Sequence, residues 1–576
     1  MKDYGAPLAH KVSGGHKLAQ ALKAKGVRQV FTLSGGFVNP IFMGCLEQGI
    51  DLIGARSETE AGFMAVAMAR ATREPAVVVA EPSGFTNYVS AVADAYLAGD
   101  PVIFISASAN MHHFDNGGFK ELPQSDVVRS MTKYAVEVSA PERIGWFLDK
   151  AYDIANNHPK GPVQLTIPIN HLFTGKLGVP LEGRCFDPAR RKTHTAIAHP
   201  DDVAEVAALL RRARRPAIIA GAGVWYGHAE VGLLQLAERW GIPVFTPFCH
   251  IKAINIGHPQ HMGLLDHDLN PMSRLVGEQA DLILMFGGVL DFALNFGEEP
   301  VIGKQTTLVA VNATPQELSK NMLADIRICG DLQHLAQTLA VVPDAGVADP
   351  GWMPLLRRER LDCVAKYREL LTASVQPVHP LRMCFDVIAS LSPSDVLVID
   401  GGDIACWAEV ALNLWVADGY PVGEVVASGP WEQMGIGSAY ATAYKMARPD
   451  ARVVLITGDG SLGLSPGWTS METAVANDLQ IIVVVSNNAQ WGMIQEQQKA
   501  MWGKVVGTSL RDVDYHKVYA ASGTHATLVR DPAELPHALH AAYAQDKPAL
   551  IEVKTLSAAS PSTETMVRIR IQTADH

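Results

Sequence analysis

One local pattern recurs in three long stretches of the chain: a short Val/Ile-rich run, a Gly-rich turn, and an Ala/Leu-rich segment of helical character. Short apolar runs bounded by glycines are typical of strands buried on both faces. Because such strands alternate with helices, the pattern predicts an α/β fold with three doubly wound parallel-sheet domains. We place these domains at residues 1–180, 195–345 and 375–557, with a tail at 558–576. The stretches share no fixed period, which argues against a solenoid.

Length and charge narrow the classes of function. The 576 residues suffice for several domains, since one domain typically takes ~150 residues. The net charge of −11, the pI near 6.0 and the lack of a long basic run argue against nucleic acid or an anionic membrane as the main partner. We therefore expect a small-molecule substrate.

The lack of a recognisable targeting signal and the pattern of cysteines lead us to expect a cytoplasmic protein. No apolar run approaches the ~20 residues needed to cross a bilayer, and the first residues lack the apolar core of a signal peptide. The seven cysteines form no CxxC pair, which favours reduced thiols over disulfides or a zinc site.

The sharpest motif is Gly458-Asp459-Gly460-Ser461, followed 26 residues later by Asn487-Asn488. Each half comes directly after an apolar run, and the carboxyl ends of neighbouring parallel strands meet at one sheet edge where ligands bind. The glycines let the backbone approach an anion, and the helix that follows offers free N–H groups. Asp459 and Asn488 are hard oxygen ligands suited to Mg²⁺. A Gly-Asp-Gly turn alone is more often a plain turn, but the whole arrangement is specific.

This arrangement resembles the thiamine-diphosphate signature of the superfamily that contains acetolactate synthase, benzaldehyde lyase and 2-hydroxyacyl-CoA lyase. The resemblance implies thiamine diphosphate and Mg²⁺ as cofactors, with a pyrimidine-binding, a middle and a diphosphate-binding domain. It implies a homodimer or homotetramer with active sites at the dimer interface. It makes the main-chain carbonyl of Gln490 the third protein ligand of the metal, and it assigns cofactor binding to Gly458, Gly460, Ser461 and Asn488.

The family also needs a glutamate from the pyrimidine-binding domain, and Glu58 in IGARSETEAGFMAVAMARA is the candidate. A carboxyl beside the aminopyrimidine promotes the imino tautomer, which removes the thiazolium C2 proton; this requires a dry site. The alternative is a plain carboxylate that complements a helix N-terminus. The resemblance further implies that Gly35 and Gly36 lie near the reacting centre and that Asn87 opens a helix of the cofactor site.

The segment SGPWEQMGIGSAYATAYKMARPD resembles the family's stretch beneath the cofactor. The resemblance implies that Met434 is wedged between the two cofactor rings and that the carbonyl of Glu432 accepts from the 4′-amino group, with Gln433 in the same site. A methionine in an Ala/Gly-rich segment is usually core. The family commonly has a glycine where Glu432 stands.

Several segments favour the lyases over acetolactate synthase. NNAQWG, GFTNYVSAV and VVGTSLRDVDYHKV resemble benzaldehyde lyase and bacterial 2-hydroxyacyl-CoA lyases. Gln497 stands where acetolactate synthases have a channel tryptophan, and Val289 replaces the arginine that helps them hold FAD. We therefore expect a lyase or carboligase acting on 2-hydroxyacyl-CoA or 2-hydroxy ketones, no FAD, and ADP as an open option for the middle domain.

Other functions stay open. A 2-oxo acid or oxalyl-CoA decarboxylase, an acetolactate synthase-like carboligase and a catalytically idle homologue remain alternatives. A nicotinamide dehydrogenase has only GAGVWYG in its favour, which is not the G-x-G-x-x-G fingerprint.

Proton transfer at the substrate is less well defined by the sequence. His113 and Lys120 fall where the family has a polar loop near the active site, and Gln490 and Glu496 are spaced to share one helix face. For each alone, a surface or packing role is at least as plausible as catalysis.

The tail SPSTETMVRIRIQTADH shows no partner strand and suggests a mobile lid or arm. Arg568 and Arg570 at i and i+2 would face the same side of an extended segment, where they could clamp the phosphates of a CoA thioester. The alternative is an ordinary edge strand.

Overall fold

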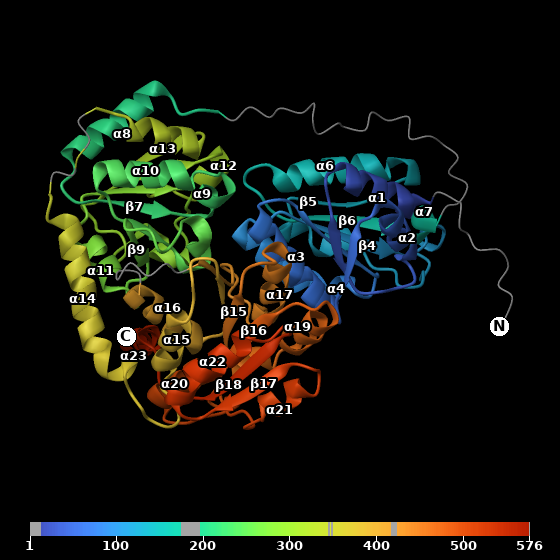
Figure 1. Cartoon of the computed structure of the whole chain (residues 1–576). Coiled ribbons are helices and arrows are strands. Elements are labelled where there is room, and N and C mark those ends of the chain that lie inside the picture. Colours follow the sequence, from blue (N-terminus) through green and yellow to red (C-terminus); the bar gives the residue numbers. More distant parts are fainter. Residues whose placement is uncertain (1–12, 174–195, 344–345, 347–348, 416–422, 575–576) are drawn as a thin grey trace. The chain divides into compact units, whose positions relative to one another are not determined.

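Three six-stranded sheets form the framework of the chain (Figure 1). The computed structural model describes residues 13–173, 196–343, 346, 349–415 and 423–574, so the segment between the first two predicted domains lies outside the described residues. All neighbouring strands within each sheet pair in parallel. Helices separate most successive strands, which confirms the predicted α/β fold with three parallel sheets. Within the described part of the chain, every helix is too short or too polar to cross a membrane.

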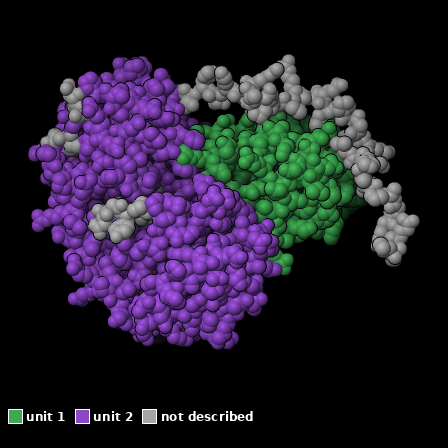
Figure 2. All heavy atoms as spheres, in the orientation of Figure 1, with its two compact units in different colours: residues 1–194 green, residues 195–576 purple. Residues whose placement is uncertain are grey.

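The chain divides between residues 194 and 195 into two compact units (Figure 2). Unit 1 holds the first sheet, in the order β2-β1-β3-β4-β6-β5. Its strands are β1 Gln29–Thr32, β2 Asp51–Gly54, β3 Ala76–Ala80, β4 Val102–Ser108, β5 Tyr134–Glu137 and β6 Val163–Pro168. Its helices are α1 Gly14–Ala24, α2 Asn39–Gln48, α3 Glu58–Thr72, α4 Phe85–Ala98, α5 Gln124–Val127, α6 Ile144–Asn156 and α7 Ile169–Phe173.

The central strands β3, β4 and β6 of the first sheet are buried on both faces, because their side chains alternate between two helical layers. Val77 and Val79 of β3 pack into a core shared with α1, α2, α6 and α7. On the other face, Phe104 of β4 meets Tyr88 of α4, and the alanine-rich α3 packs beside α4. Small side chains on α3 permit this approach, since a Cβ on Gly62 would lie 2.7 Å from Ala91.

Unit 2 contains the second sheet, in the order β12-β11-β10-β7-β8-β9. Its strands are β7 Pro216–Ala220, β8 Val244–Thr246, β9 His261–Leu264, β10 Leu282–Phe286, β11 Thr307–Asn312 and β12 Ile326–Cys329. The helices around it are α8 Pro200–Arg212, α9 Ala222–Tyr226, α10 Glu230–Trp240, α11 Pro271–Gln279, α12 Pro315–Leu318 and α13 Leu332–Ala340. The long helix α14 Trp352–Leu371 then leads to the third sheet.

The third sheet, also in unit 2, has the order β14-β13-β15-β16-β18-β17. Its strands are β13 Val396–Ile399, β14 Glu424–Ala427, β15 Val453–Gly458, β16 Ile481–Asn487, β17 His525–Val529 and β18 Ala549–Lys554. Its helices are α15 Pro380–Ala389, α16 Asp403–Trp415, α17 Gly437–Ala447, α18 Asp459–Leu462, α19 Ser465–Ala476, α20 Gly492–Trp502, α21 Tyr515–Ala520 and α22 Leu535–Tyr543. The chain leaves β13 toward β14 on one side and continues through β15 on the other, so a topological switch point lies between β13 and β15. Ligands of open α/β sheets bind at such points.

The expectation of an extended tail is wrong, because residues Pro561–Ala574 form helix α23. In a helix, positions i and i+2 point about 200° apart, so Arg568 and Arg570 cannot face the same side. The Val/Ile/Arg alternation suggested a strand, but a start signal precedes it: the Ser560 hydroxyl accepts from the Thr563 N–H, and proline occupies the first turn. Helix α23 packs against α20 and α16.

Candidate active site

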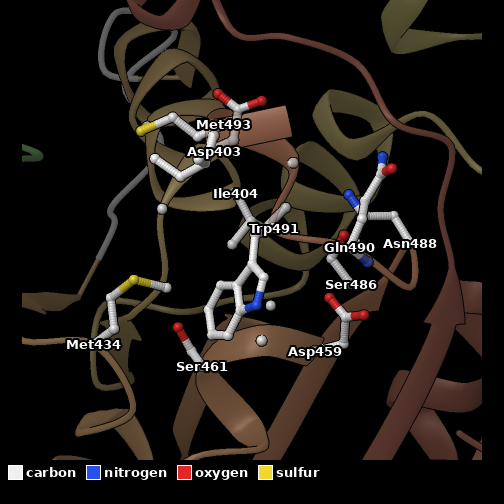
Figure 3. Close-up of a pocket in the computed structure, with 15 residues that line it drawn as sticks. Asp403, Ile404, Met434, Asp459, Ser461, Ser486, Asn488, Gln490, Trp491 and Met493 are labelled. Carbon is white, nitrogen blue, oxygen red and sulfur yellow. Dashed lines mark hydrogen bonds between the residues drawn. The ribbon is translucent and has the colours of Figure 1, made fainter. Parts of the chain in front are cut away.

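A cavity of about 110 Å³ opens at the carboxyl edge of the third sheet (Figure 3). Its walls come from the ends of β15 and β16, from the segments that follow β13, β15 and β16, and from the loop between β14 and α17. The lining residues are Gly402, Asp403, Ile404, Met434, Gly458, Asp459, Gly460, Ser461, Ser486, Asn488, Gln490, Trp491, Gly492, Met493 and Ile494. Strands β15 and β16 are neighbours in register, with Gly458 opposite Ser486, and this pairing brings the two halves of the sequence motif together.

Asp459 lies at the start of α18, directly after β15, and only 3% of it is exposed. Its Oδ2 has no hydrogen-bond partner among the described residues, and neither has the buried hydroxyl of Ser461. Burial raises the pKa of Asp459 to about 6. Buried polar atoms are normally hydrogen-bonded, so these two oxygens at one cavity are suited to bind a polar ligand. A metal ion beside a phosphate group would satisfy both.

The two asparagines of the motif have different roles. Asn487 turns away from the cavity, where its Nδ2 donates to Glu552 of β18 at 2.7 Å. Asn488 lines the cavity, and its Oδ1 accepts from the main-chain N–H of Gln490 at 3.2 Å. Figure 3 shows Asp459, Asn488 and Gln490 on one side of the Trp491 ring and Met434 on the other. No group of three His, Cys, Asp or Glu side chains suited to a metal occurs in the described residues, so a metal here would need amide and main-chain oxygens besides Asp459.

The loop between β14 and α17 brings Met434 to the cavity, whereas Glu432 and Gln433 lie outside its lining. Asp400, at the end of β13, fixes this loop by accepting from the N–H groups of Gly435 and Gly437 at 3.1 and 3.0 Å. Glu432 has a φ of 51°, a left-handed conformation that favours glycine, which explains the family's preference at this position. Burial raises the pKa of the Glu432 carboxyl.

Sequence reasoning missed two lining segments. Gly402 to Ile404 follow β13, and a Gly-Gly pair after a strand was the available signal. Trp491 packs on the Gly-Asp-Gly turn so closely that a Cβ on Gly460 would lie 2.5 Å from its ring. Nothing in the local sequence indicated this contact, because it depends on how the Trp491 side chain packs.

The expected helix face shared by Gln490 and Glu496 is not found, because α20 begins at Gly492 and Gln490 lies in the loop before it. Gln490 and Met493 line the cavity. Glu496 instead binds Lys499 at 2.7 Å and lies 3.4 Å from the Ser557 hydroxyl. Gln497 is 5% exposed, and its Oε1 accepts from Arg570 of α23.

In unit 1, Glu58 is the first residue of α3 and is 7% exposed. Asn87 of α4 donates to its Oε2 at 2.9 Å, which brings two of the predicted site residues together. The carboxylate also lies against Gly84, since a Cβ there would be 2.2 Å from Glu58 Oε1. The Thr59 hydroxyl donates to the Asn87 carbonyl at 2.6 Å and ties the two helix starts to each other.

The remaining predicted residues of unit 1 lie on loops at the same sheet edge. Gly35 follows β1 and faces Glu81, a residue that follows β3 and that the sequence did not single out. Lys120 forms an ion pair with Glu81 at 2.8 Å. Gly36 has open space around it, and His113 is exposed.

Comparison with known proteins shows to which family the chain belongs. Models of the thiamine pyrophosphate enzymes match in three parts: the N-terminal TPP binding domain over residues 12–128, the central domain over 203–339 and the C-terminal TPP binding domain over 405–553. The chain is 32% identical to a probable acetolactate synthase of Mycobacterium bovis, over 95% of this chain and 96% of that protein. It belongs to the thiamine pyrophosphate enzyme family.

Within this family, the chain is also similar to proteins with another name. It is 28% identical to human 2-hydroxyacyl-CoA lyase 2, over 91% of this chain and 87% of that protein. It is 26% identical to mouse 2-hydroxyacyl-CoA lyase 1, over 94% of each. Glu58 falls within the N-terminal TPP binding match, and Asp459 falls within the C-terminal one. The resemblance found from the sequence motifs is thereby confirmed.

Proposed function

We propose that this thiamine pyrophosphate enzyme uses Mg²⁺ to cleave or form a carbon–carbon bond next to a carbonyl, in 2-hydroxyacyl-CoA or 2-hydroxy ketone substrates. The observation that carries the proposal is the cavity in which Asp459 Oδ2 and the Ser461 hydroxyl are buried and have no hydrogen-bond partner among the residues that the structure describes. Asp459, Asn488 and the Gln490 carbonyl would hold the metal. Gly458, Gly460 and Ser461 would hold the diphosphate.

Thiamine diphosphate supplies a nucleophilic carbon and an electron sink when it is bound. Glu58 would hold a proton at the pyrimidine ring, which suits a carboxyl that is 7% exposed. Asn87 orients it by donating to one oxygen and leaves the other for the ring. Met434 would keep the cofactor bent, and its place on the cavity wall fits that role.

The proposed choice of a lyase over an acetolactate synthase-like carboligase depends on the residue at position 497. Gln497, which stands where acetolactate synthases place a channel tryptophan, is buried against Arg570 of α23 and does not line the cavity. This supports a lyase. The second candidate is an acetolactate synthase-like carboligase, which the 32% identical Mycobacterium protein favours. A 2-oxo acid or oxalyl-CoA decarboxylase would use the same cofactor chemistry, and an idle homologue would lack activity altogether.

We further propose that the middle domain binds no FAD. In the Gly221-Ala222-Gly223 turn, the N–H of Gly221 donates to the Phe286 carbonyl at 2.9 Å. The N–H of Gly223 donates to the Gly287 carbonyl, also at 2.9 Å. Donors used in this way are not available to a pyrophosphate. The same contacts argue against ADP at this turn.

The described cysteines are free thiols, which fits the reducing cytoplasm proposed as the location.

A substrate screen tests the reaction. The purified protein with thiamine diphosphate and Mg²⁺ is incubated with benzoin, a 2-hydroxyacyl-CoA, pyruvate or oxalyl-CoA, and the products are identified by mass spectrometry. Cleavage of benzoin or of the CoA substrate is expected. If acetolactate forms from pyruvate while neither benzoin nor the CoA substrate is cleaved, the carboligase candidate would replace the proposed lyase.

A cofactor-retention assay tests the site independently of the substrate. Asp459→Ala removes the charged metal ligand, so dialysed protein should lose its thiamine diphosphate. Asp514→Ala, at an exposed carboxylate paired with Lys517 in the same domain, is the control and should retain it. Equal retention in both variants would refute the metal assignment.

A further inference from the structure

Glu81 joins three separate segments of unit 1 at the carboxyl edge of the first sheet. It follows β3 directly, and its side chain is 9% exposed. Its Oε1 accepts from the main-chain N–H of Phe37 at 2.5 Å, and its Oε2 lies 2.8 Å from Lys120 Nζ. One carboxylate therefore holds the loop after β1 and the loop after β4 together.

The surrounding backbone is shaped for this carboxylate. A Cβ on Gly35 would lie 1.9 Å from Glu81 Cγ, so any other residue at position 35 would displace Glu81. Lys120 has a φ of 61°, and its loop is closed by Glu121, which accepts from the N–H groups of Asp115 and Gly118 at 2.7 Å each. The ammonium is thus held in one place before any ligand arrives.

Aromatic rings complete the surroundings of the ion pair. Lys120 Nζ lies 5.1 Å from the centre of the Phe37 ring and 5.5 Å from that of Phe119. The two rings meet edge to face at 6.0 Å, and Phe119 is 74% exposed. A ligand at this loop would therefore meet apolar rings beside a cation whose charge is already balanced.

The Glu81 end of the pair also lies near the proposed catalytic glutamate in space. The turn that starts at Glu81 contains Gly84, against which the Glu58 carboxylate packs. On the basis of the proposed function, we infer that Glu81 determines substrate specificity. By neutralising Lys120, it makes this loop select uncharged substituents and discriminate against the carboxylate of a 2-oxo acid.

The physical reason is a difference in charge. A partly buried ammonium without a partner would bind a carboxylate through a charge-assisted hydrogen bond. Here Glu81 already accepts that bond and repels a second anion. The Phe37 and Phe119 rings still offer apolar contact to a neutral group.

The test compares Glu81→Gln with wild type. Glutamine keeps the shape and an acceptor for the Phe37 N–H, but it leaves the charge of Lys120 unbalanced. Two quantities are measured: the dissociation constant of oxamate, an unreactive carboxylate analogue of pyruvate, and the ratio of kcat/KM for pyruvate over benzoin. Oxamate affinity and this ratio should each rise roughly tenfold or more. The gain in oxamate affinity should shrink as salt is added.

Two further variants make the result specific. In Glu81→Gln combined with Lys120→Met the gain should vanish, because the cation is gone. Asp126→Asn removes the same charge from an exposed carboxylate of α5 that pairs with Arg129 at 2.6 Å and not with Lys120; it should leave both quantities as in wild type.

Cofactor retention separates this inference from the proposed function. Retention and proton exchange at the reactive carbon should match wild type in Glu81→Gln, which leaves Glu58 and Asp459 intact. Unchanged oxamate affinity in a variant with normal retention would overturn the inference. A wild-type protein that turns over no substrate would instead contradict the proposed function, while oxamate binding would still decide the role of Glu81.

Discussion

Glu58 combines two properties that a proton-transferring carboxyl needs: it is nearly buried, and a neutral amide rather than a cation fixes it in place. Asn87 donates to one oxygen without neutralising the group. A cation in the position of Asn87 would favour the ionised form and weaken proton return. The arrangement suits a carboxyl that shares a proton with the cofactor.

We predict that Glu58→Gln slows C2 hydrogen–deuterium exchange of bound thiamine diphosphate by orders of magnitude while cofactor affinity changes little. Glutamine keeps the shape and can still contact Asn87, but it cannot carry the proton. Exchange is followed by NMR after acid quench. Exchange at the wild-type rate would move the role to another residue.

Asp400 gives the site a dependence on pH through the loop that carries Met434. Burial raises the pKa of Asp400 to about 6, from 3.8 for an unperturbed aspartate. The folded protein therefore binds a proton at higher pH than the unfolded chain does. The cost of burying the charge is present in full above pH 6 and disappears as the pH falls through this window.

Wild type should accordingly gain about 2 kcal/mol from this group between pH 6 and 4. Asp400→Asn cannot ionise and should lose that part of the pH dependence. Denaturation of both proteins at several pH values measures the difference. Parallel curves for the two proteins would show that Asp400 stays ionised throughout.

At the scale of elements, helix α23 is fixed at its first turn. Asp403, which lines the cavity, accepts from the Thr563 hydroxyl at 2.6 Å and from the Ser560 N–H at 3.1 Å. The other end of the helix reaches α20 through Arg570 and Gln497. The proposed lid is thus connected by side chains to the cavity wall.

Removing one of these contacts should loosen the helix selectively. Thr563→Val deletes a buried hydrogen bond to a carboxylate, which is worth about 1–3 kcal/mol. Amide hydrogen exchange in α23 should then accelerate while β15 and β16 exchange as in wild type. Glu564→Gln, at an exposed position of the same turn, is the matched control. Equal exchange in both variants would mean that the Asp403 contact does not hold the helix.

The elements also show what the sequence could and could not predict. Asp459 and Asn488 could be paired in advance, because each follows an apolar strand and parallel strands end at one edge. Glu81 and Trp491 could not, since their partners come from segments distant in sequence or from side-chain packing. The tail was mistaken for an extended segment because its alternating β-branched residues outweighed the Ser-Pro start signal.

At the scale of the whole molecule, the proposed catalytic groups fall in different units: Glu58 in residues 1–194 and Asp459 in residues 195–576. Both units expose large apolar side chains, including Tyr96 and Leu97 of α4 at 45% and 44% and Trp468 of α19 at 37%. Burial of these side chains against another subunit would stabilise an assembly. We propose that each active site combines Glu58 of one subunit with Asp459 of another, so the active protein is at least a dimer.

Light scattering should therefore give a mass of at least twice the 62.0 kDa of one chain, and a mass of one chain in an active preparation would refute the proposal. Mixing two inactive variants gives a sharper test. When Glu58→Gln and Asp459→Ala subunits are unfolded, mixed in equal amounts and refolded, half of the dimers contain one of each. In these dimers both substitutions fall in one site and the other site is wholly wild type. Activity should thus return to about a quarter of the wild-type value. If one chain supplied both residues, every site in the mixture would carry a defect and no activity would return.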